Sequence, residues 1–337
     1  MTITQFERKK QQYIHAASRT LEWATRLLKN NGSFRGAARE VDAYYFGPLA
    51  FSLGGYVQEP KRILSYIQNT FLINGDINNP EDSTLQGAAN FRNAWLCVGA
   101  HRSSEYRISY SMVDQLKYCQ NPVTGGVAVY KTTEPETQIT DMGTTAAASI
   151  AFLATGNIKA ALQAGDFLAN ILVEKQPNAG HRILLRTDWD GKWLSQFPTV
   201  EAGRYEIQIG APGQVYWFLG IAMAALAQLY ATSRKEHYLQ AGRTVFGWTK
   251  SCEPGVFEDL TAAKVGLGTS ALYAATADTE FSTAATRVGD MLVKTQLPEG
   301  VWLRRPTITK LQEQPLAVSL STSLERACWL LDITRNL

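Results

Sequence analysis

Two kinds of helical segment alternate along the whole sequence. In the first kind, apolar side chains recur every three or four residues between polar ones, as at Ile14, Ala17, Leu21, Ala24 and Leu28, which is typical of an amphipathic helix. Segments of this kind cover residues 4–29, 59–73, 104–119, 157–175, 235–251 and 280–296. Segments of the second kind are apolar on nearly every side or rich in small residues, and cover residues 41–54, 83–100, 140–154, 207–232, 259–277 and 315–333. Strand patterning is nearly absent, so the sequence predicts an all-α protein.

A short motif ends the last amphipathic segment and recurs in weaker forms. Its strict copy is Gln296-Leu-Pro-Glu-Gly300-Val-Trp302, in which three residues separate the glutamine from the glycine. The weaker copies keep this spacing, lengthen it, or keep only a glycine followed two positions later by an aromatic residue: Gln176 to Gly180, Gln120 to Gly125, Gln68 to Gly75, Gly32 to Phe34 and Gly255 to Phe257. Six copies at such regular intervals indicate a repeat protein.

Six helix pairs have one economical arrangement. A single pair is too small to bury its own apolar face, so neighbouring pairs must stack, and closing the row into a ring buries the sixth pair against the first. The sequence therefore predicts an (α/α)6 toroid that occupies residues 1–337 as a single domain, with the apolar helices inside and the amphipathic helices outside. The recurring glycine suits a turn with positive φ at a helix end. An irregular helical bundle is the alternative.

The spacing of the recurring glycines marks an insertion. Successive glycines of the motif lie 43, 50, 55, 75 and 45 residues apart, and the excess in the longest gap falls at residues 182–205. This stretch connects an outer helix to the next inner helix, and every such connection lies at the rim where the inner helices begin. Insertions on one rim of a repeat scaffold usually shape a binding mouth, so we expect this one to border the cavity. A surface hairpin without function is the alternative.

The composition excludes several classes of protein. Of the 337 residues, 45% are hydrophobic and 19% are charged, which indicates a large core and excludes a disordered chain. The net charge of +3, from 33 basic and 30 acidic residues, is too balanced for a nucleic-acid partner. The four cysteines lie far apart in apolar helical segments, which indicates buried free thiols in a reducing compartment. The N-terminus lacks the apolar core of a signal peptide, and we expect a cytoplasmic protein.

Acidic residues recur at or near the start of the predicted inner helices. They are Asp42, Asp82, Asp141, Glu206, Asp259 and Glu313. Each of them also fits a plain helix cap, because Asp and Glu favour helix N-termini. Together they would form an acidic collar at the mouth of a cavity lined by aromatic side chains.

The repeated motif resembles that of a known family. Gln-x-x-x-Gly-x-Trp on helix pairs is similar to the QW repeats of class II terpene cyclases, the squalene-hopene and oxidosqualene cyclases, and related repeats occur in protein prenyltransferase β subunits. The resemblance covers the whole chain as six repeats, although only the copy at Gln296 to Trp302 is strict. Those cyclases usually have two helical domains, whereas this chain has residues for one. It therefore resembles the monodomain cyclases of cyanobacterial meroterpenoid biosynthesis.

The resemblance implies a protonation chemistry and a candidate acid. The family protonates an alkene or epoxide with an Asp-x-Asp-Asp motif at the start of an inner helix, followed by Thr-Ala. Here Asp141-Met-Gly-Thr-Thr-Ala146 aligns with that motif and keeps only its first aspartate. The middle aspartate delivers the proton in the family, so either Asp141 has taken over this role or another carboxyl group of the rim acts. We expect Asp141 to be the catalytic acid of an intramolecular isomerase.

Such chemistry needs a protonated acid in a dry pocket and walls that stabilise carbocations without reacting with them. Burial raises the pKa of a carboxyl group, and each aromatic face attracts a cation by about 0.5–2 kcal/mol. The resemblance implies a linear isoprenoid or prenylated aromatic acid as substrate, with no cofactor and no metal. So apolar a substrate is compatible with contact at a membrane surface, although no segment indicates it. We expect the substrate to contact Asp42, Tyr44, Tyr45, Phe91, Trp95, Trp189, Tyr216, Trp217 and Arg186.

Two other interpretations stay open. The four histidines are scattered and form no His-Glu-x-x-His motif, which disfavours zinc chemistry. Toroids of this kind also host glycosidases, epimerases and lyases, and Asp188, Asp190, Trp189 and Trp193 would supply two carboxyl groups and aromatic platforms for a sugar. A chamber without a buried carboxyl group would instead favour a non-catalytic isoprenoid-binding protein.

Overall fold

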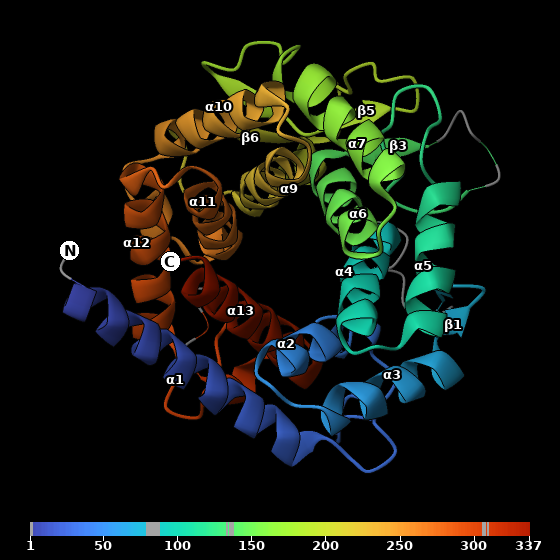
Figure 1. The fold of residues 1–337 in the computed structure, drawn as a ribbon, viewed down its shortest axis with the longest axis vertical. Coiled ribbons are helices and arrows are strands. Elements are labelled where there is room, and N and C mark those ends of the chain that lie inside the picture. The colour runs from blue at the N-terminus through green and yellow to red at the C-terminus, as the bar shows by residue number, and fades with distance from the viewer. Residues whose placement is uncertain (1–2, 79–87, 133, 135–137, 305–307, 309) are drawn as a thin grey trace.

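Two concentric rings of helices make up the protein (Figure 1). The computed structural model describes residues 3–78, 88–132, 134, 138–304, 308 and 310–337. The inner helices are α2 (Gly47–Leu53), α4 (Ala89–Arg102), α6 (Met142–Ala154), α9 (Trp217–Ser233), α11 (Ala263–Thr276) and α13 (Leu316–Asn336). The outer helices are α1 (Ile3–Leu27), α3 (Gln58–Thr70), α5 (Tyr106–Tyr118), α7 (Ile158–Asp166) with a π-helical continuation (Phe167–Val173), α10 (Glu236–Cys252) and α12 (Thr279–Thr295). This arrangement is the (α/α)6 toroid that the sequence predicts.

Each outer helix packs on the inner helix that precedes it in the sequence. Helix α3 packs on α2, α5 on α4, α7 on α6, α10 on α9 and α12 on α11. The inner helices contact one another in the order α2, α4, α6, α9, α11 and α13, and α13 contacts α2 to close the ring. Helix α1 packs on α13, so the first and last helices of the chain meet in the wall (Figure 1). The helices therefore form one closed body.

Most of the recurring glycines set the distance between consecutive outer helices, whereas Gly180 and Gly255 have no positive φ and nothing within 4 Å of a Cβ position. Four of them, Gly32, Gly75, Gly125 and Gly300, have a φ between 80° and 86°. A Cβ atom on any of the four would lie 2.7 Å or less from a carbonyl oxygen of the next outer helix, at Arg62, Ser111, Gln163 and Arg19 respectively. Only glycine satisfies both conditions, which explains why it recurs at these positions.

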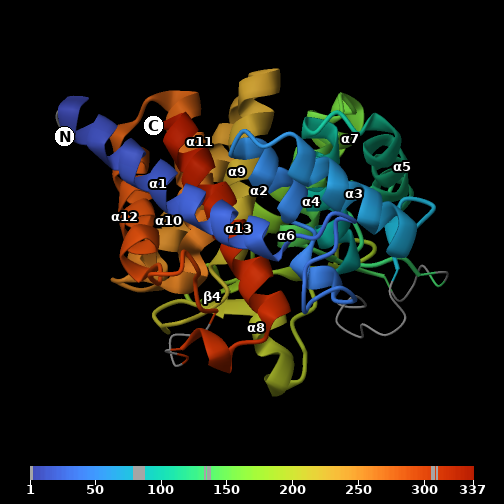
Figure 2. The ribbon, with the colours of Figure 1, turned by 90° about the horizontal axis from the view of Figure 1, so that it is seen from below.

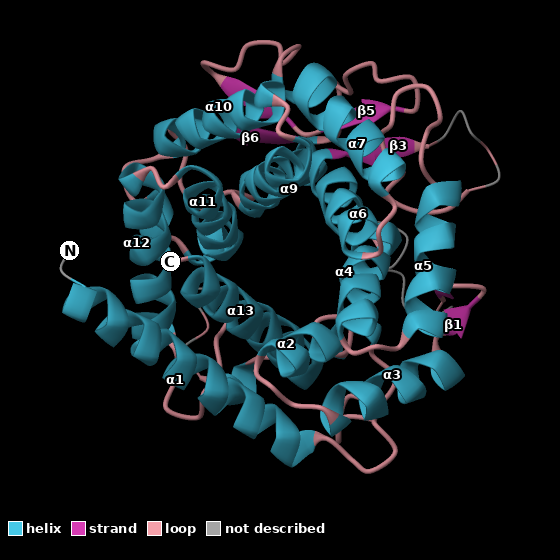
Figure 3. Ribbon diagram, viewed as in Figure 1, coloured by secondary structure: helices cyan, strands magenta, loops and turns pink. Residues whose placement is uncertain are grey.

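Short strands lie in the loops, which the sequence pattern does not reveal. Strand β1 (Leu72–Ile73) pairs with β2 (Asp76–Ile77), β3 (Ile139–Asp141) with β5 (Arg186–Asp188), and β4 (Arg182–Leu184) with β6 (Glu206–Gln208), all antiparallel. Strands of two or three residues are too short to show an alternation of apolar and polar positions. Figure 3 shows that the labelled strands lie outside the inner ring.

The insertion at residues 182–205 is folded. It contributes β4 and β5, and then passes through a 3-10 turn (Thr199–Glu201) to the short helix α8 (Ala202–Tyr205). Its strands pair with β3, directly before α6, and with β6, before α9. The insertion therefore lies at the rim where the inner helices begin, and Figure 2 shows β4 and α8 below the helical rings on this side.

Inner helix α9 begins later than the sequence predicts. Its expected range was 207–232, but residues 206–208 form β6, and Gly210 and Gly213 then turn the chain at positive φ. Pro212 lies between these glycines and cannot donate a backbone hydrogen bond. From Phe218 to Ala227 every residue is buried, as expected for a helix enclosed on all sides. Within the described residues, none of the helices is long and apolar enough to cross a membrane.

The four cysteines are buried free thiols, as predicted. Burial raises the pKa of the Cys97 and Cys252 thiols to about 12, so both stay protonated at neutral pH. These side chains act as small apolar groups of the core.

Candidate functional site

Four aromatic rings surround the ammonium group of Lys264 inside the inner ring. The Lys264 Nζ atom lies 5.3 Å from the ring centroid of Trp217, 5.8 Å from those of Phe46 and Phe91, and 6.0 Å from that of Trp329. These distances lie in the range of cation–π attraction. Lys264 belongs to α11, and the rings come from α9, the residue before α2, α4 and α13. We call Phe46, Phe91, Trp217 and Trp329 the aromatic cage.

Glu325 compensates the charge of the ammonium group. Lys264 Nζ donates a hydrogen bond to Glu325 Oε1, and the indole Nε1 of Trp329 donates to the same oxygen at 3.1 Å. The side chains of Lys264 and Glu325 are only 9% and 18% exposed. Burial lowers the pKa of Lys264, while the charge and the hydrogen bond of Glu325 act in the opposite direction. The pair therefore lies in surroundings largely shielded from water, with Lys264 held between Glu325 and the aromatic cage.

Close helix packing fixes the position of this pair. Lys264 is the second residue of α11, and a Cβ atom on Gly220 of α9 would lie 2.2 Å from its carbonyl oxygen. Glu325 and Trp329 are four residues apart on α13 and therefore share one helix face. The sequence interpretation missed both Lys264 and Glu325. The sequence does contain one signal for Lys264, which is the single charged residue in the apolar segment between positions 260 and 276.

Two predicted substrate-binding residues, Asp42 and Tyr45, lie beside the cage. Arg92 Nε donates to Asp42 Oδ1 at 2.7 Å, and the Arg92 guanidinium lies 5.8 Å from the ring centroid of Tyr45. Burial raises the pKa of Tyr45, and the negative charges of Glu325 and Asp42 add to this shift. Tyr45 is therefore a protonated phenol in the field of both carboxylates.

Trp95 closes the cage on the side away from the insertion. Its ring centroid lies 5.0 Å from that of Trp329, 5.7 Å from that of Phe46 and 6.3 Å from that of Phe91. Its Nε1 is buried and has no hydrogen-bond partner among the described residues. The predicted residues Phe91, Trp95 and Trp217 are thus brought together around Lys264.

Asp141 caps helix α6. Its Oδ1 accepts a hydrogen bond from the N–H of Thr144 at 2.6 Å, and its Oδ2 lies 3.6 Å from Arg186 Nη2. Both charged side chains are buried, and the Arg186 guanidinium also lies 4.9 Å from the ring centroid of Tyr205. These contacts are those of a helix cap with a charge partner, and the case for Asp141 as the acid rests on the resemblance alone.

Ion pairs replace the predicted acidic collar. Three of its members are paired with arginines, namely Asp42 with Arg92, Asp141 with Arg186 and Glu206 with Arg182. Asp259 accepts the N–H of Thr261 at 2.6 Å and caps a 3-10 turn. Glu313 is exposed, and Asp82 lies outside the described residues. Asp42, Asp141, Glu206 and Asp259 therefore each meet a cap donor or an arginine from a neighbouring segment.

Three predicted substrate-binding residues support loops instead. The hydroxyl group of Tyr44 accepts the N–H of Phe34 at 3.0 Å, so this ring packs toward the outer layer. Tyr216 donates to the carbonyl oxygen of Ala211 at 2.8 Å and ties down the turn before α9. Trp189 lies in the turn after β5 and is partly buried. Burial against a loop and burial against a ligand give the same sequence pattern, so the pattern did not separate these residues from the cage.

The residues considered for a sugar site form a tight turn within the insertion. Asp188 Oδ1 accepts the N–H groups of Asp190 at 3.1 Å and of Lys192 at 2.8 Å. Trp193 Nε1 donates to the carbonyl oxygen of Lys175 at 3.2 Å. These contacts stabilise the turn and leave no pair of carboxyl groups facing the cage from this segment.

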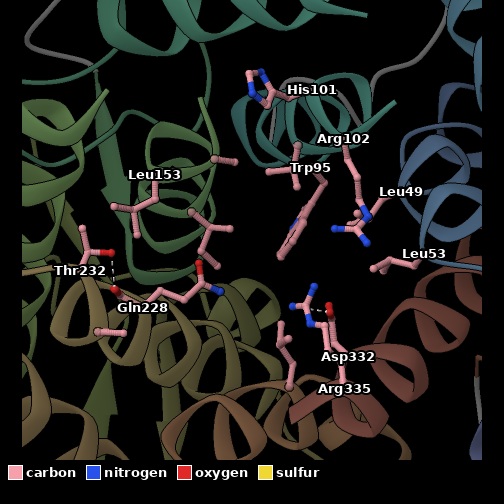
Figure 4. A pocket seen from close by; sticks show the side chains of 15 residues that line it. Leu49, Leu53, Trp95, His101, Arg102, Leu153, Gln228, Thr232, Asp332 and Arg335 are labelled. Carbon is pink, nitrogen blue, oxygen red and sulfur yellow. Dashed lines mark hydrogen bonds and ion pairs between the residues drawn. The ribbon is translucent and has the colours of Figure 1, made fainter. Parts of the chain in front are cut away.

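A cavity of about 480 Å³ lies at the other end of the inner ring. Its walls come from the C-terminal parts of α2, α4, α6, α9 and α13, together with Leu267 of α11. Figure 4 shows Trp95 in the wall, with Arg102, Asp332 and Arg335 on the same side of the cavity. Since Trp95 also touches three rings of the cage, it stands between the cavity and the Lys264–Glu325 pair. The insertion at residues 182–205 contributes nothing to this lining.

Among the residues that the structure describes, no three His, Cys, Asp or Glu side chains are placed to hold a metal ion.

Comparisons with known proteins bear on the fold. No protein-family model and no curated protein matches the sequence. A D-mannose isomerase superposes with a TM-score of 0.66 at 13% identity, over 100% of this chain and 98% of that one. The GH76A α-1,6-mannanase from Salegentibacter sp. HEL1_6 superposes with a TM-score of 0.63 at 14% identity, over 96% and 99%. A variant of the type II terpene cyclase MstE from Scytonema, in complex with its substrate geranylgeranyl dihydroxybenzoate, gives 0.57 at 13% identity, over 98% and 100%.

The chain has the (α/α)6 toroid fold. These three structures, which share the fold, are named for three different activities. At these low identities the likeness extends to the fold and not to the reaction, because one fold supports many chemistries. The function has to be argued from the site.

Proposed function

We propose that the protein is an enzyme that transfers a proton to an isoprenoid chain at the aromatic cage and thereby starts a cyclisation through carbocations, as class II terpene cyclases do. The observation that carries this proposal is the Lys264–Glu325 pair enclosed by four aromatic rings. A buried proton donor and cation-stabilising walls are the two things this chemistry requires.

Glu325 is the acid of the proposed reaction. Lys264 and Trp329 both donate to Oε1, and no described residue donates to Oε2, which leaves Oε2 to carry the proton toward the substrate. Transfer from Oε2 to an alkene carbon breaks the O–H bond, forms a C–H bond and leaves a carboxylate. The substrate then carries the positive charge. Loss of a proton from the cyclised product to Glu325 restores the acid, so substrate and product have equal mass.

Lys264 has to be neutral when the carbocation forms. An ammonium ion in the cage would repel a second cation, whereas the neutral amine does not. The lone pair of the amine has to point away from the substrate, because it would otherwise form a C–N bond with the carbocation. The neutral amine is the form that burial favours, since burial lowers the pKa of Lys264. In the proposed reactive state the proton lies on Glu325, which can then donate it to the substrate. Lys264 and Glu325 are both uncharged in this state. Each ring then stabilises the carbocation by about 0.5–2 kcal/mol.

Product analysis with variants tests the proposal. We expect the protein to convert geranylgeranyl dihydroxybenzoate or a linear polyprene, without added metal, into isomers of equal mass that mass spectrometry and chromatography resolve. Glu325→Gln should lower turnover by about a hundredfold or more, in the range of general acid catalysis. Glu313→Gln, at an exposed carboxyl group, is the matched control and should keep full activity.

The same assay decides between the two candidate acids. Full activity of Glu325→Gln together with inactivity of Asp141→Asn, with both variants folded by circular dichroism, would return the role to Asp141. If the wild-type protein forms no isomer from any prenylated aromatic acid or linear polyprene, the cyclase proposal is wrong.

Carbohydrate chemistry is the second candidate, and the charged groups at the start of the inner helices favour it. Sugar sites combine aromatic platforms with carboxylates and hydrogen-bonding cations, and here Asp42 with Arg92 lies beside Tyr45 and the cage. Two of the proteins with this fold are named for action on mannose or mannan. Interconversion of mannose and fructose, or hydrolysis of α-1,6-mannotriose, by the wild-type protein would establish this function in place of the cyclase.

A further inference from the structure

We propose that the cavity at the end of the inner helices is a second binding site, which takes an apolar molecule carrying a carboxylate group and anchors it on Arg102. Its volume of about 480 Å³ lies in the range of pockets for small organic ligands. The site is separate from the cage and does not depend on the reaction proposed for it.

The lining divides into an apolar interior and a charged edge. Side chains such as Leu49, Leu53, Ile150, Leu153 and Leu267 form the walls together with the ring of Trp95. The charged residues of the lining, Arg102, Asp332 and Arg335, lie in the last turns of α4 and α13. In Figure 4 they stand together on one side of the cavity. The polar side chains of His101, Gln228 and Thr232 complete the lining. A ligand that satisfies the apolar walls and the charged edge has a hydrocarbon body and one polar head.

The charge balance at the edge selects an anionic head. Asp332 Oδ1 lies 2.8 Å from Arg335 Nη2, so these two charges compensate each other. Arg102 acts on Asp332 only at longer range, and its guanidinium has no hydrogen bond or ion pair among the residues that the structure describes. One positive charge therefore remains at the edge, on a side chain whose planar fork matches a carboxylate.

The C-terminal ends of the inner helices disfavour an anion, but they do not decide the charge of the ligand that binds. The carbonyl groups at the C-termini of the inner helices carry partial negative charge, which favours cations within the last turn. Arg102 and Arg335 are the cations that occupy this position in the folded protein. A ligand carboxylate would meet the outer side of the Arg102 guanidinium, where a hydrogen-bonded contact between full charges is stronger than the contribution of the helix dipoles.

Three probes with the same tail and different heads test the site. Binding of decanoate, 1-decanol and decyltrimethylammonium is measured by titration calorimetry below their micelle concentrations. We expect decanoate to bind and to bind more tightly than 1-decanol, and decyltrimethylammonium to bind least. Equal affinity for decanoate and 1-decanol, a preference for the cation, or no binding of any probe would overturn the proposal.

Four variants locate the binding. Arg102→Met should weaken decanoate binding roughly tenfold, as the loss of one charged hydrogen-bonded contact does, and should leave 1-decanol binding unchanged. Ala231→Trp, at an exposed lining position, should fill the cavity and weaken both probes. Arg107→Met is the matched control, since Arg107 is an exposed arginine outside the lining, and should change nothing. Glu325→Gln should bind decanoate normally, which separates this site from the proposed reaction. Decanoate binding that survives both Arg102→Met and Ala231→Trp would contradict the assignment.

Discussion

At the scale of single residues, the buried charge pair in the cage is the feature that stability alone does not explain. Removing two ions from water costs several kcal/mol each, and replacing such a pair by apolar side chains is often neutral or stabilises a protein by about 1–4 kcal/mol. The rings around Lys264 and the N–H of Trp329 offset part of this cost. Buried groups with shifted pKa values cluster at functional sites, and this pair lies where the inner helices converge.

Lys264 should make the stability of the protein depend on pH in the alkaline range. Its pKa in the folded state is lowered from 10.5, so between the lowered value and 10.5 the unfolded chain binds more protons than the folded chain. The free energy of unfolding contributed by this group therefore rises with pH across that window. In the double variant Lys264→Gln with Glu325→Gln this contribution is absent.

Urea unfolding at several pH values measures the effect. The difference in unfolding free energy between the wild-type protein and the double variant should grow as the pH rises toward 10.5. The exposed pair Lys250 and Glu280, changed in the same way to glutamine, provides the control, and its difference should stay constant. If the unfolding free energies of the wild-type protein and the double variant change in parallel with pH, burial does not lower the pKa of Lys264.

The residue types of the cage were predictable, but its charged centre was not. Phe91, Trp95 and Trp217 could be selected because large aromatic residues in apolar helices mark the interior. Lys264 and Glu325 are 61 positions apart, and only the packing of α11 beside α13 brings them together. The alignment of Asp141 with a family motif located a helix start correctly, yet its charge partner comes from the insertion, which no local pattern connects to it.

At the scale of elements, the contact between α9 and α11 depends on two glycines. A Cβ atom on Gly268 would lie 2.3 Å from the carbonyl oxygen of Gly220, and one on Gly220 would lie 2.2 Å from that of Lys264. The two backbones therefore touch, which lets the first turn of α11 present Lys264 to the cage. Small residues in the inner helices thus allow the helices to pack closely into a ring, and they also place Lys264 in the cage.

Gly220→Ala should separate these helices. The added methyl group meets backbone atoms of Lys264 and Val265, which cannot rotate away, and overpacking of this kind costs about 1–3 kcal/mol. Gly247→Ala is the matched control, because nothing lies within 4 Å of its Cβ position in α10. That variant should gain up to about 1 kcal/mol from helix propensity. Chemical unfolding measures both, and equal stability of the two variants would refute the contact.

The sequence predicted the ends of a helix well where the helix has a clear periodic pattern of apolar residues. Helix α12 was expected at 280–296 and occupies Thr279–Thr295, because an amphipathic stripe has a clear beginning and end. The expectation failed at α9, because the expected range also covered residues of strand β6 and the turn from Gly210 to Gly213, which precede the helix. The strands of the insertion were missed because ladders of three residues are stabilised by partners distant in sequence.

At the scale of the whole molecule, the contact that joins the last repeat to the first has the same hydrogen bonds as a contact between consecutive repeats. We call each such contact a seam. Gln296 Nε2 donates to the carbonyl oxygens of Gly300 at 3.2 Å and of Ala16 in α1 at 2.8 Å. Gln120 Nε2 donates in the same way to Gly125 at 3.1 Å and to Ala160 in α7 at 2.9 Å. At these two copies the recurring motif, which the sequence shows, therefore links one repeat to the next outer helix, and the copy at Gln296 closes the ring.

A closed ring makes a definite prediction about these two glutamines. Gln296→Ala and Gln120→Ala each remove hydrogen bonds that tie a loop to the next outer helix, and each should lower the unfolding free energy by about 1–3 kcal/mol. Both variants should still unfold in one transition, with far-UV circular dichroism and tryptophan fluorescence coinciding, because the two seams are equivalent. In an open row of repeats, Gln296→Ala would instead release the terminal repeat first and split the transition, as one-dimensional repeat arrays do. Gln58→Ala, at an exposed position, should stay within about 0.5 kcal/mol of the wild-type protein. A split transition for Gln296→Ala alone would show that the contact between α1 and α13 does not close the molecule into one cooperative unit.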